Sequence, residues 1–566
     1  MSWPVAGSSR GRHGRAVPSP IRPRGGPGLA SGSGGYFDAG MPMTCAHVFP
    51  AAALPVRMVD AREYHERTKH SPRSVRESDH RLDPATKPRP YKDYLDLPAF
   101  EPPMAPDPPD TPVLSVIAEP SPDPAVDREP DGEPDVHALC RYATGVTKEL
   151  SVRGREMRFR AAACTGKLYH VDCYAVTGDC GPFDPGVYHY DPDADAFDVI
   201  RTGDYRGVLA AAAGGHDGVA AAPVTIVATS QWWRNAWKYR ARTYRHAFWD
   251  SGTILANFLA TAHAAGHRAE AVVGFADQPV VDLLGVDPEA EAPLELVPVG
   301  SGDAVPDSPA VDAIAPETVP LSPEQEEYPL VPEAWRQSGL ADGDAATEWR
   351  QRVRDADRGD VGRHPPGDGD RVALDPVDDD TASARPVGET IERRGSLREY
   401  SHDPISDRKL ATVLDRALRG VPTDGGSDAP GRLLDCYCLV HAVDGIPSGA
   451  YQYYPDETDL ERIGPTDRET AGHVALDQPV VGDAAVNVYL MADIEAVVDR
   501  LGDRGYRLAQ LEAGVGLGRL YLATYAHLAL GGRGFTFYDD LVTEHLSPRA
   551  AGQTPMTLFA FGRPVE

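Results

Sequence analysis

The stretch Ile391–Tyr400 contains three arginines and a serine, residue types that suit the binding of an anion. Arg393, Arg394 and Arg398 carry planar guanidinium groups, which match phosphate oxygens better than a point charge does. Ser396 and the backbone N–H groups around it would complete an anion cradle ahead of a helix. The alternative is a charged helix turn on the surface, and this stretch by itself favours neither interpretation.

Residues that bind metals or carry out redox chemistry are scattered. His65 and His70 are five positions apart, which turns them by about 140° on a helix, so we expect ordinary surface histidines and no metal. Cys436 and Cys438 lie two apart in an apolar run, on one face of a predicted strand. We expect buried thiols in a reducing cytosol, with a metal or redox pair as the alternative.

The composition describes a large acidic protein. Its 566 residues exceed what one hydrophobic core holds, so about two to four domains are expected. Acidic residues outnumber basic ones 85 to 56, and the net charge of −29 argues against nucleic acid or an anionic membrane as partner. The absence of a long apolar run predicts no transmembrane helix. Such acidity is typical of a halophile's cytoplasmic protein.

Changes in composition suggest four segments. Residues 1–57 are rich in Gly, Pro, Ser and Arg and are expected to be disordered or to precede the true start, for which Met58 is a candidate. A first domain is expected at 58–300 and a second at 385–566. Between them, 301–384 reads as an acidic linker rich in Pro and Gly that contains a short helix.

The two expected domains are copies of one another. Tyr188 matches Tyr451, and the triplet 172–174 matches 435–437, at an offset of 263 positions. Further along the chain Gly252 matches Gly514 at an offset of 262, a difference of one residue. We therefore predict an internal duplication of a domain of about 180–200 residues.

Each copy repeats the same order of elements. An apolar strand at 224–230 or 485–493 precedes a long apolar helix, 251–266 or 512–530, and a final strand closes the copy. Interleaved helices and strands predict an α+β fold with a central sheet. Because the long helices are apolar almost all round, they should be buried, in the core or between the copies.

In this order the motifs resemble the nitroreductase-fold FMN proteins. The arginine stretch is similar to the start of those proteins, and the loop Arg160–Tyr169 (RAAACTGKLY) is similar to their PSAG loop. The tandem arrangement, the YHERTKHSP opening and the KYR segment resemble SagB/ThcOx-type (azoline) dehydrogenases in particular. This resemblance implies two tandem nitroreductase-like domains that form an intrachain pseudo-dimer, with FMN held between them.

In that family one protomer supplies the phosphate arginines and the other supplies the PSAG loop. Here the first copy has no arginine motif and has Ser301 at the place of Arg563, whereas the second has 426–429 (GSDA) at the place of the loop. The resemblance thus implies one composite FMN site, with a scaffold whose two sites are both degenerate as the alternative. Its expected cofactor-binding residues are Arg394, Gly395, Ser396, Arg398, Thr536 and Arg563 from the second copy, and Ala163, Cys164, Thr165 and Gly166 from the first.

The resemblance also assigns the chemistry to Lys238 and Tyr239. In the azoline dehydrogenases a Lys-Tyr pair assists oxidation, and a lysine with a lowered pKa would remove a proton while flavin N5 takes a hydride. The second copy reads Leu501-Gly502-Asp503 at this place, so the fold does not require the pair. The alternative is a surface lysine on an aromatic-rich interface. Trp232, Trp233 and Trp237 would line a pocket or pack between the copies.

The sequence therefore predicts an FMN-dependent oxidoreductase that oxidises azoline-like heterocycles. The alternatives are a general NAD(P)H-dependent nitro or quinone reductase and a flavin-free scaffold in a peptide-modifying complex. The expected partners are a small-molecule or modified-peptide substrate and other peptide-modifying enzymes.

Overall fold

The computed structural model describes residues 59–118, 121–124, 129–130, 132–152, 155–378, 385–424 and 433–565. The predicted extension at 1–57 and the segment 426–429 lie outside these ranges.

The described residues up to position 299 form a mixed set of helices and strands. Its elements are α1 (Ala61–Arg67), α2 (Pro72–Arg76), η1 (Pro84–Thr86), β1 (Ala99–Phe100), α3 (Val113–Val116), α4 (Val136–Thr144), β2 (Val146–Val152), β3 (Arg155–Arg160), η2 (Thr165–Lys167), β4 (Val171–Thr177), β5 (Gly186–Asp191), β6 (Ala196–Thr202), α5 (Arg206–Ala212), α6 (Asp217–Ala221), β7 (Val224–Gln231), α7 (Trp232–Tyr239), η3 (Arg240–Arg242), α8 (Thr243–Ala264), α9 (Asp277–Leu284) and β8 (Glu291–Val299).

The later part of the chain repeats much of this order. Its elements are α10 (Leu330–Gln337), α11 (Gly343–Arg354), η4 (Gly359–Val361), β9 (Arg371–Ala373), α12 (Val387–Arg393), α13 (Asp407–Leu418), β10 (Asp435–Val440), β11 (Gly449–Tyr454), β12 (Asp459–Gly464), α14 (Arg468–Val474), α15 (Pro479–Asp483), β13 (Val486–Ala492), α16 (Ile494–Leu501), α17 (Asp503–Ala526), β14 (Gly531–Phe535), α18 (Asp539–Leu546) and β15 (Thr554–Gly562).

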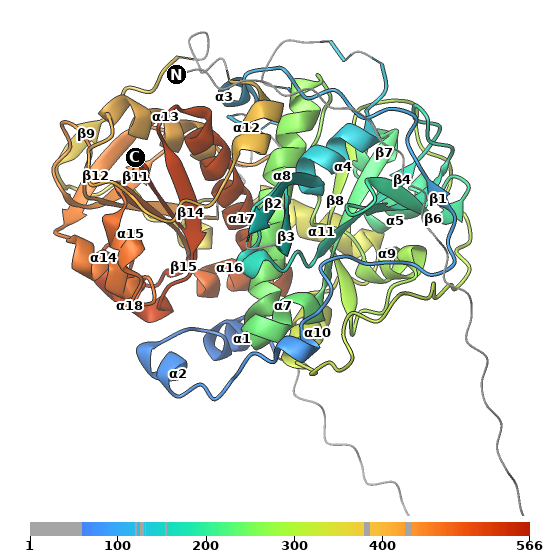
Figure 1. The fold of residues 1–566 in the computed structure, drawn as a ribbon, viewed down its shortest axis with the longest axis horizontal. Helices are drawn as coiled ribbons and strands as arrows, with labels where there is room; N and C mark the ends of the chain where they lie inside the picture. The colour runs from blue at the N-terminus through green and yellow to red at the C-terminus, as the bar shows by residue number, and fades with distance from the viewer. Residues whose placement is uncertain are drawn as a thin grey trace, which may run out of the picture. The chain divides into compact units, whose positions relative to one another are not determined.

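Each copy has its own antiparallel sheet, and the two sheets match strand for strand. The first runs β1-β6-β5-β4-β7-β8, and the second runs β9-β12-β11-β10-β13-β15 with β14 added at its edge. The sheets lie on opposite sides of the long helices α8 and α17 (Figure 1). This arrangement confirms the predicted α+β fold with two tandem domains.

The helices α8 and α17 cross at a pair of equivalent glycines. A Cβ atom on Gly252 would lie 2.4 Å from the carbonyl carbon of Gly514, and one on Gly514 would lie 2.3 Å from the Phe248 oxygen. Glycine is needed at such a close approach of two backbones. The equivalent rings of Tyr244 and Tyr506 stack there, with centroids 6.4 Å apart and planes inclined by 17°. Equivalent residues therefore meet as they would at a twofold axis, and the prediction that both helices are buried is confirmed.

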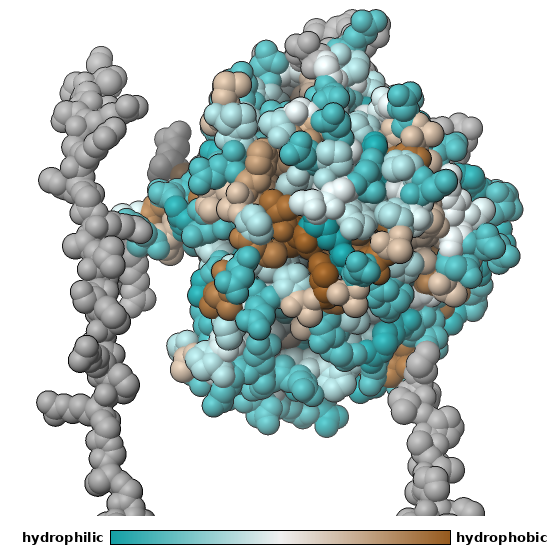
Figure 2. All heavy atoms as spheres, turned by 90° about the vertical axis from the view of Figure 1, so that its right-hand side faces the viewer, coloured by the Kyte–Doolittle hydropathy of each residue, from teal (hydrophilic) through white to brown (hydrophobic). Residues whose placement is uncertain are grey.

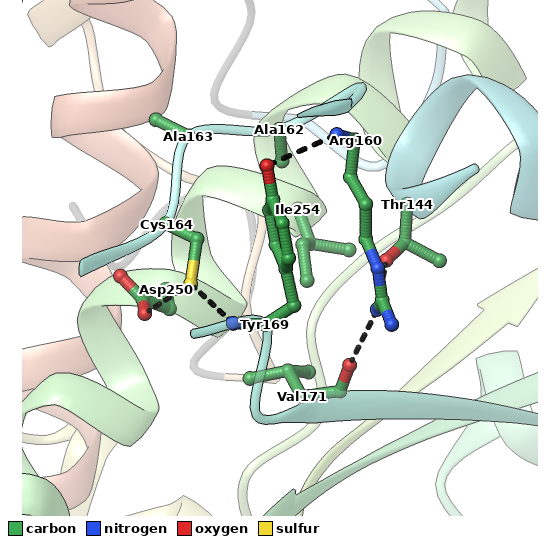
Figure 3. A pocket seen from close by; sticks show the side chains of 9 residues that line it. All are labelled: Thr144, Arg160, Ala162, Ala163, Cys164, Tyr169, Val171, Asp250 and Ile254. Carbon is green, nitrogen blue, oxygen red and sulfur yellow. Dashed lines mark hydrogen bonds between the residues drawn. The ribbon is translucent and has the colours of Figure 1, made fainter. Parts of the chain in front are cut away.

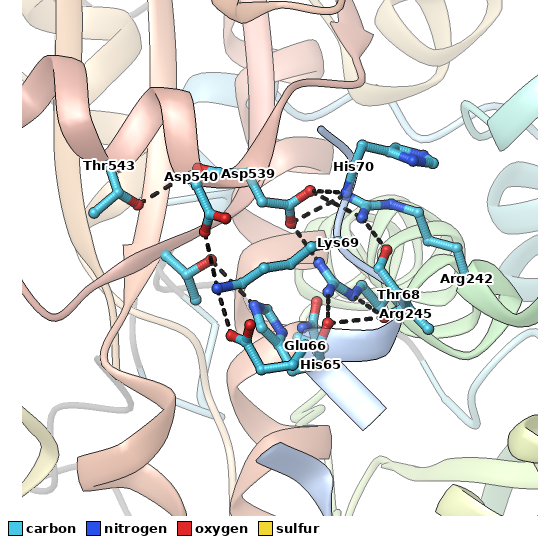
Figure 4. A network of polar contacts seen from close by, with 12 residues as sticks. His65, Glu66, Thr68, Lys69, His70, Arg242, Arg245, Asp539, Asp540 and Thr543 are labelled. Carbon is cyan, nitrogen blue, oxygen red and sulfur yellow. Dashed lines mark hydrogen bonds and ion pairs between the residues drawn. The ribbon is translucent and has the colours of Figure 1, made fainter. Parts of the chain in front are cut away.

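A buried ion cluster joins the first copy to the second beside this crossing (Figure 4). Arg242 and Arg245, at the start of α8, bind the carboxylate of Asp539 on α18 at 3.0 and 2.7 Å. Burial alone would raise the pKa of Asp539, but the two guanidinium charges outweigh it and hold that pKa far below its usual range. We call this cluster the first clamp.

The second clamp is the same arrangement with the copies exchanged. Arg504 and Arg507, at the start of α17, bind Asp277 on α9 at 2.6 and 2.7 Å. All three residues stand 262 positions before or after their counterparts in the first clamp. The duplication has therefore been kept where it holds the two domains together.

The clamps also hold two short helices, α1 and α10. Thr68 after α1 and Ser338 after α10 each accept clamp-arginine hydrogen bonds through the side-chain oxygen and the backbone carbonyl. The carbonyls of His65 and Trp335 accept one more each. These pairs are 270 positions apart, so α10, inside the predicted linker 301–384, corresponds to the YHERTKHSP opening. The domain boundaries themselves remain a prediction.

Figure 2 shows the face of the first copy that carries β1 and β6, turned toward the viewer. Hydrophilic residues cover most of it, and hydrophobic ones gather in one group near its centre. Within the described residues, every helix is too short or too polar to cross a bilayer.

Candidate active site at the seam between the copies

The loop at Ala163–Gly166 is held by one carboxylate, that of Asp250 on α8 (Figure 3). The Thr165 backbone N–H donates to it at 2.9 Å and the Thr165 hydroxyl at 2.7 Å. The Cys164 thiol donates to its other oxygen at 3.1 Å, and Thr253 bonds the Ala163 carbonyl at 2.7 Å. Burial and the neighbouring carboxylate raise the pKa of Cys164, so its sulfur stays protonated as the donor. Asp250 thus fixes the shape of the loop.

The same carboxylate also contacts His170, and this arrangement has the composition of a metal site. His170 Nε2 lies 2.9 Å from the Asp250 oxygen that also contacts Cys164. The possible ligand atoms of the three residues lie within 4.8 Å of one another. The hydrogen bonds to Asp250 account for this cluster without an ion.

Arg394 reaches from the second copy to the backbone of this loop. Its Nε donates to the Ala161 carbonyl at 2.9 Å, and its Nη2 donates to the Arg160 carbonyl at 2.8 Å. In the opposite direction, Lys148 Nζ on β2 of the first copy donates a hydrogen bond to the Arg393 carbonyl of the second at 3.0 Å. The arginine stretch and the loop, predicted as two halves of one site, therefore lie together. Arg394 uses two of its three nitrogens on carbonyls, so it positions the loop more than it offers donors to a phosphate.

The remaining residues of the arginine stretch lie close to the end of the chain. Ser396 and Arg398 are exposed, and so is Arg563. Ser401 N–H donates to the Arg563 carbonyl at 2.8 Å, which keeps the two segments side by side. In the described part of the chain, neither Arg398 nor Arg563 has an acidic partner, and both side chains can receive an anion.

Two smaller predicted positions also lie in the second copy. Gly395 packs near Tyr525, whose hydroxyl would lie 3.4 Å from a Cβ atom at that glycine. Thr536 is half-buried after β14, and its carbonyl accepts a hydrogen bond from Gln478 at 3.4 Å.

Arg533 on β14 is a residue of this site that the motifs did not reveal. It is half-buried, its guanidinium lies 4.9 Å from the Phe535 ring centre, and no carboxylate among the described residues pairs with it. Burial and the charge of Arg398 lower the pKa of Arg533, while Tyr239 is among the groups that oppose this shift. Arg533 is therefore near enough to both the arginine stretch and the Lys-Tyr pair for their charges to interact. The sequence shows Arg533 only as one basic residue among many, and its place on the edge strand β14 is known from the structure.

Lys238 and Tyr239 end α7 against the loop. The Tyr239 hydroxyl would lie 2.8 Å from a Cβ atom on Gly166, whose φ of +65° is itself a glycine conformation. Lys238 is exposed, and its Nζ lies 5.0 Å from the Tyr239 ring centre. Partial burial of the ammonium and the positive charges of Arg533 and Lys87 lower the pKa of Lys238. Burial, together with the charge of the Asp250 carboxylate, raises the pKa of Tyr239.

The three tryptophans of α7 are buried, and each indole N–H has a partner within the first copy or the segment after it. Trp232 donates to the Pro288 carbonyl at 3.1 Å and Trp233 to Ser322 at 2.8 Å. Trp237 donates to the Asp83 carbonyl at 3.1 Å. These side chains hold neighbouring segments onto α7, and the Trp232 ring also packs edge-on against Tyr244, one of the two rings that stack between the copies.

The expectation of ordinary surface histidines is wrong for His65. Its two ring nitrogens contact the hydroxyls of Tyr506 at 3.2 Å and Thr554 at 3.1 Å, and burial lowers its pKa well below the usual value. His70 is partly exposed, and burial lowers its pKa to about 3. The expectation that Cys436 and Cys438 are buried thiols is confirmed, since both are buried and free.

The corresponding place in the second copy lacks this chemistry. Helices α7 and α16 correspond at an offset of 262, so Arg500 and Leu501 replace Lys238 and Tyr239, one position earlier than the sequence alignment implied. Glu512 replaces Asp250 and accepts a hydrogen bond from Leu433 N–H at 2.7 Å. Among the described residues the Lys-Tyr pair belongs to the first copy alone.

The fold and the seam together define a duplicated α+β protein with an unpaired cationic site between its copies. The family model described as "Nitroreductase family" matches residues 157–301 and 391–563. The chain belongs to the Nitroreductase family.

Two known proteins are similar to this chain in sequence or in fold. A protein of Methanocaldococcus jannaschii that is named as a nitroreductase is 30% identical over 191 residues, covering 31% of this chain and 91% of its own length. The crystal structure of an Anabaena variabilis protein, also named as a nitroreductase, matches with a TM-score of 0.65 at 23% identity, covering 89% of this chain and 99% of its own.

A third comparison is more distant. A chain of the E. coli microcin synthetase McbBCD complex with truncated pro-MccB17 bound covers 43% of this chain and 88% of its own, at 18% identity and a TM-score of 0.27. At that score the likeness is partial and says nothing of what this chain acts on.

Proposed function

We propose that this chain is an FMN-dependent oxidoreductase with one flavin site, the composite seam site. The observation that carries the proposal is the hydrogen bonding of Arg394, from the second copy, to the loop of the first. It joins the arginine stretch to the loop on which Tyr239 packs. Family membership supports the choice of a redox cofactor.

The residues at the seam fit FMN. Arg398 and Arg563 would hold the phosphate, because guanidinium groups without a carboxylate partner suit a dianion. The loop at Ala163–Gly166 would lie against the ring system, with its shape fixed by Asp250. Bound FMN supplies a two-electron acceptor at its N5 atom.

We propose further that the substrate is an azoline-like heterocycle that is dehydrogenated. Lys238 acts as the base that removes a proton from a ring carbon of the substrate, and its lowered pKa makes the neutral amine more accessible. Tyr239, whose raised pKa keeps its hydroxyl protonated, donates a hydrogen bond to the heterocycle. Activity then rises with pH, because only the neutral form of Lys238 accepts the proton.

The test is Lys238→Ala in the flavin-loaded protein, with a thiazoline-containing peptide as substrate. We expect oxidation to fall by about 10²–10⁴-fold and to lose its rise with pH, while the flavin content stays unchanged. Lys409→Ala on α13 is the matched control, since the side chain of this lysine donates a hydrogen bond to the Leu528 carbonyl in the second copy and takes no part in the proposed chemistry. Oxidation that survives Lys238→Ala with the same pH profile contradicts the assigned role.

A second candidate is reduction of nitro compounds or quinones by NAD(P)H, favoured by the name of the M. jannaschii relative. The two reactions separate in the same variant. Reduction of a nitro compound needs no base at a substrate carbon, so it should persist in Lys238→Ala.

A further inference from the structure

The chain contains seven lysines among its 566 residues, and three of them lie on α7 or on segments that contact its C-terminal end. These are Lys87, Lys167 and Lys238, which come from three separate segments of the first copy. The chain has a net charge of −29, and nearly all of its basic residues are arginines. Three lysines in one region are therefore unusual for this protein.

Hydrogen bonds to α7 fix the position of Lys87. His80 Nε2 lies 3.2 Å from the Trp237 carbonyl, and Trp237 Nε1 contacts the Asp83 carbonyl at 3.1 Å and the Thr86 hydroxyl at 3.3 Å. Lys87 directly follows Thr86, which contacts Trp237, so the backbone of Lys87 lies near the end of α7 that bears Lys238.

The loop at Ala163–Gly166 fixes the position of Lys167. Lys167 directly follows Gly166, on which Tyr239 packs, and the Lys167 Nζ lies 3.7 Å from the Phe159 ring centre. Burial lowers the pKa of Lys167 and the charge of Lys87 lowers it further; burial, the charge of Arg533 and that of Lys87 lower the pKa of Lys238. Lys87 therefore acts on both of the other ammonium groups. Within the described residues, no carboxylate neutralises any of them.

The cations at this end of the seam exceed what FMN needs. Arg398 and Arg563 suffice for one phosphate in the proposed function. Like charges gathered without partners repel one another, and a bound anion relieves that repulsion.

We propose that Lys87 and Lys167 form a second anion-binding subsite, which recognises an anionic group, a carboxylate or a phosphate, on the substrate. The subsite rests on the proposed function, since it orients the substrate toward Lys238 and Tyr239. An anion held there places the neighbouring part of the substrate against the Tyr239 hydroxyl. Specificity for acidic substrates follows from two lysines outside the reacting pair.

The experiment measures binding of three matched probes to the full-length, flavin-loaded protein by titration. The probes are 4-nitrobenzoate, 4-nitrophenyl phosphate and neutral 4-nitrobenzamide. We expect at least one anion to bind about tenfold more tightly than the amide, and Lys87→Glu with Lys167→Glu to abolish this preference. Lys409→Glu, the same charge reversal on α13, should leave it intact.

The outcomes separate this subsite from the proposed function. The anion that binds more tightly identifies the group recognised. Equal binding of all three probes, or a preference that survives the double reversal, overturns the subsite even if thiazoline oxidation is observed. If the protein takes up no flavin, the same titration is run on the apoprotein with Arg398→Ala as a further variant. A preference lost in Arg398→Ala but kept in the lysine variant then contradicts the subsite, and the reverse supports it.

Discussion

Two parts of the seam preserve the duplication to very different degrees. The centre is the crossing of α8 and α17 with its two clamps, and the two rims are the places of Lys238 and of its counterpart Arg500. At the centre, each copy contributes an equivalent clamp, an equivalent crossing glycine and an equivalent stacked tyrosine. At the rims, one copy presents Lys238, Tyr239 and Asp250, and the other presents Arg500, Leu501 and Glu512. Packing constrains both copies alike, whereas chemistry needs only one complete set of residues. Symmetry at the centre with asymmetry at the rims is what one working site per chain predicts.

The largest expected effect is on the symmetric centre. Asp539→Asn and Asp277→Asn should each lower the free energy of unfolding by about 3–5 kcal/mol, because each leaves two buried guanidinium groups without their counter-charge. Chemical denaturation of both variants measures this. A large loss in one and none in the other would show that the clamps are not energetically equivalent.

The same clamp predicts a dependence of stability on pH. The pKa of Asp539 is lowered in the folded state, so its contribution is complete above the unfolded value of about 3.9 and is lost as pH falls below it. Asp539→Asn should therefore flatten the acid limb of a stability curve measured from pH 6 to pH 3. An acid limb as steep as that of the wild type would contradict this linkage.

A smaller effect distinguishes the rims. Asp250→Asn should weaken FMN binding by about tenfold, because the loop loses a charged acceptor for two donors of Thr165 and the thiol of Cys164. The matched change Glu512→Gln lies at the equivalent position of the other rim and should leave FMN affinity unchanged. Flavin fluorescence titration gives both values, and similar losses would mean that both rims bind flavin.

Much of the architecture could be predicted from the sequence because the duplication leaves identical residues where the backbone is constrained. Gly252 and Gly514 are retained since no other residue fits their crossing. The relation between α1 and α10 could not be predicted, because the clamps bind each of them through two carbonyls and one hydroxyl. A carbonyl is available from any residue, so His65 and Trp335 share no side-chain signal.

The candidate site was predictable where a motif marked it and not elsewhere. The arginine stretch and the loop carry recognisable patterns, and the structure brings them together. Arg533 and Asp250 carry no pattern, since each acts through its place in the fold. The exact counterpart of Lys238 was misplaced by one position because no matching residue marks where the single-residue change in offset occurs.

The stoichiometry of FMN in the purified full-length protein tests the central claim most directly. The account predicts one FMN per chain, measured by absorbance after release and referenced to protein concentration. Arg398→Ala should lower that occupancy, because it removes a free guanidinium from the phosphate end. Two FMN per chain would contradict the asymmetry of the rims, and a colourless protein that FMN cannot reconstitute would contradict the flavin site itself.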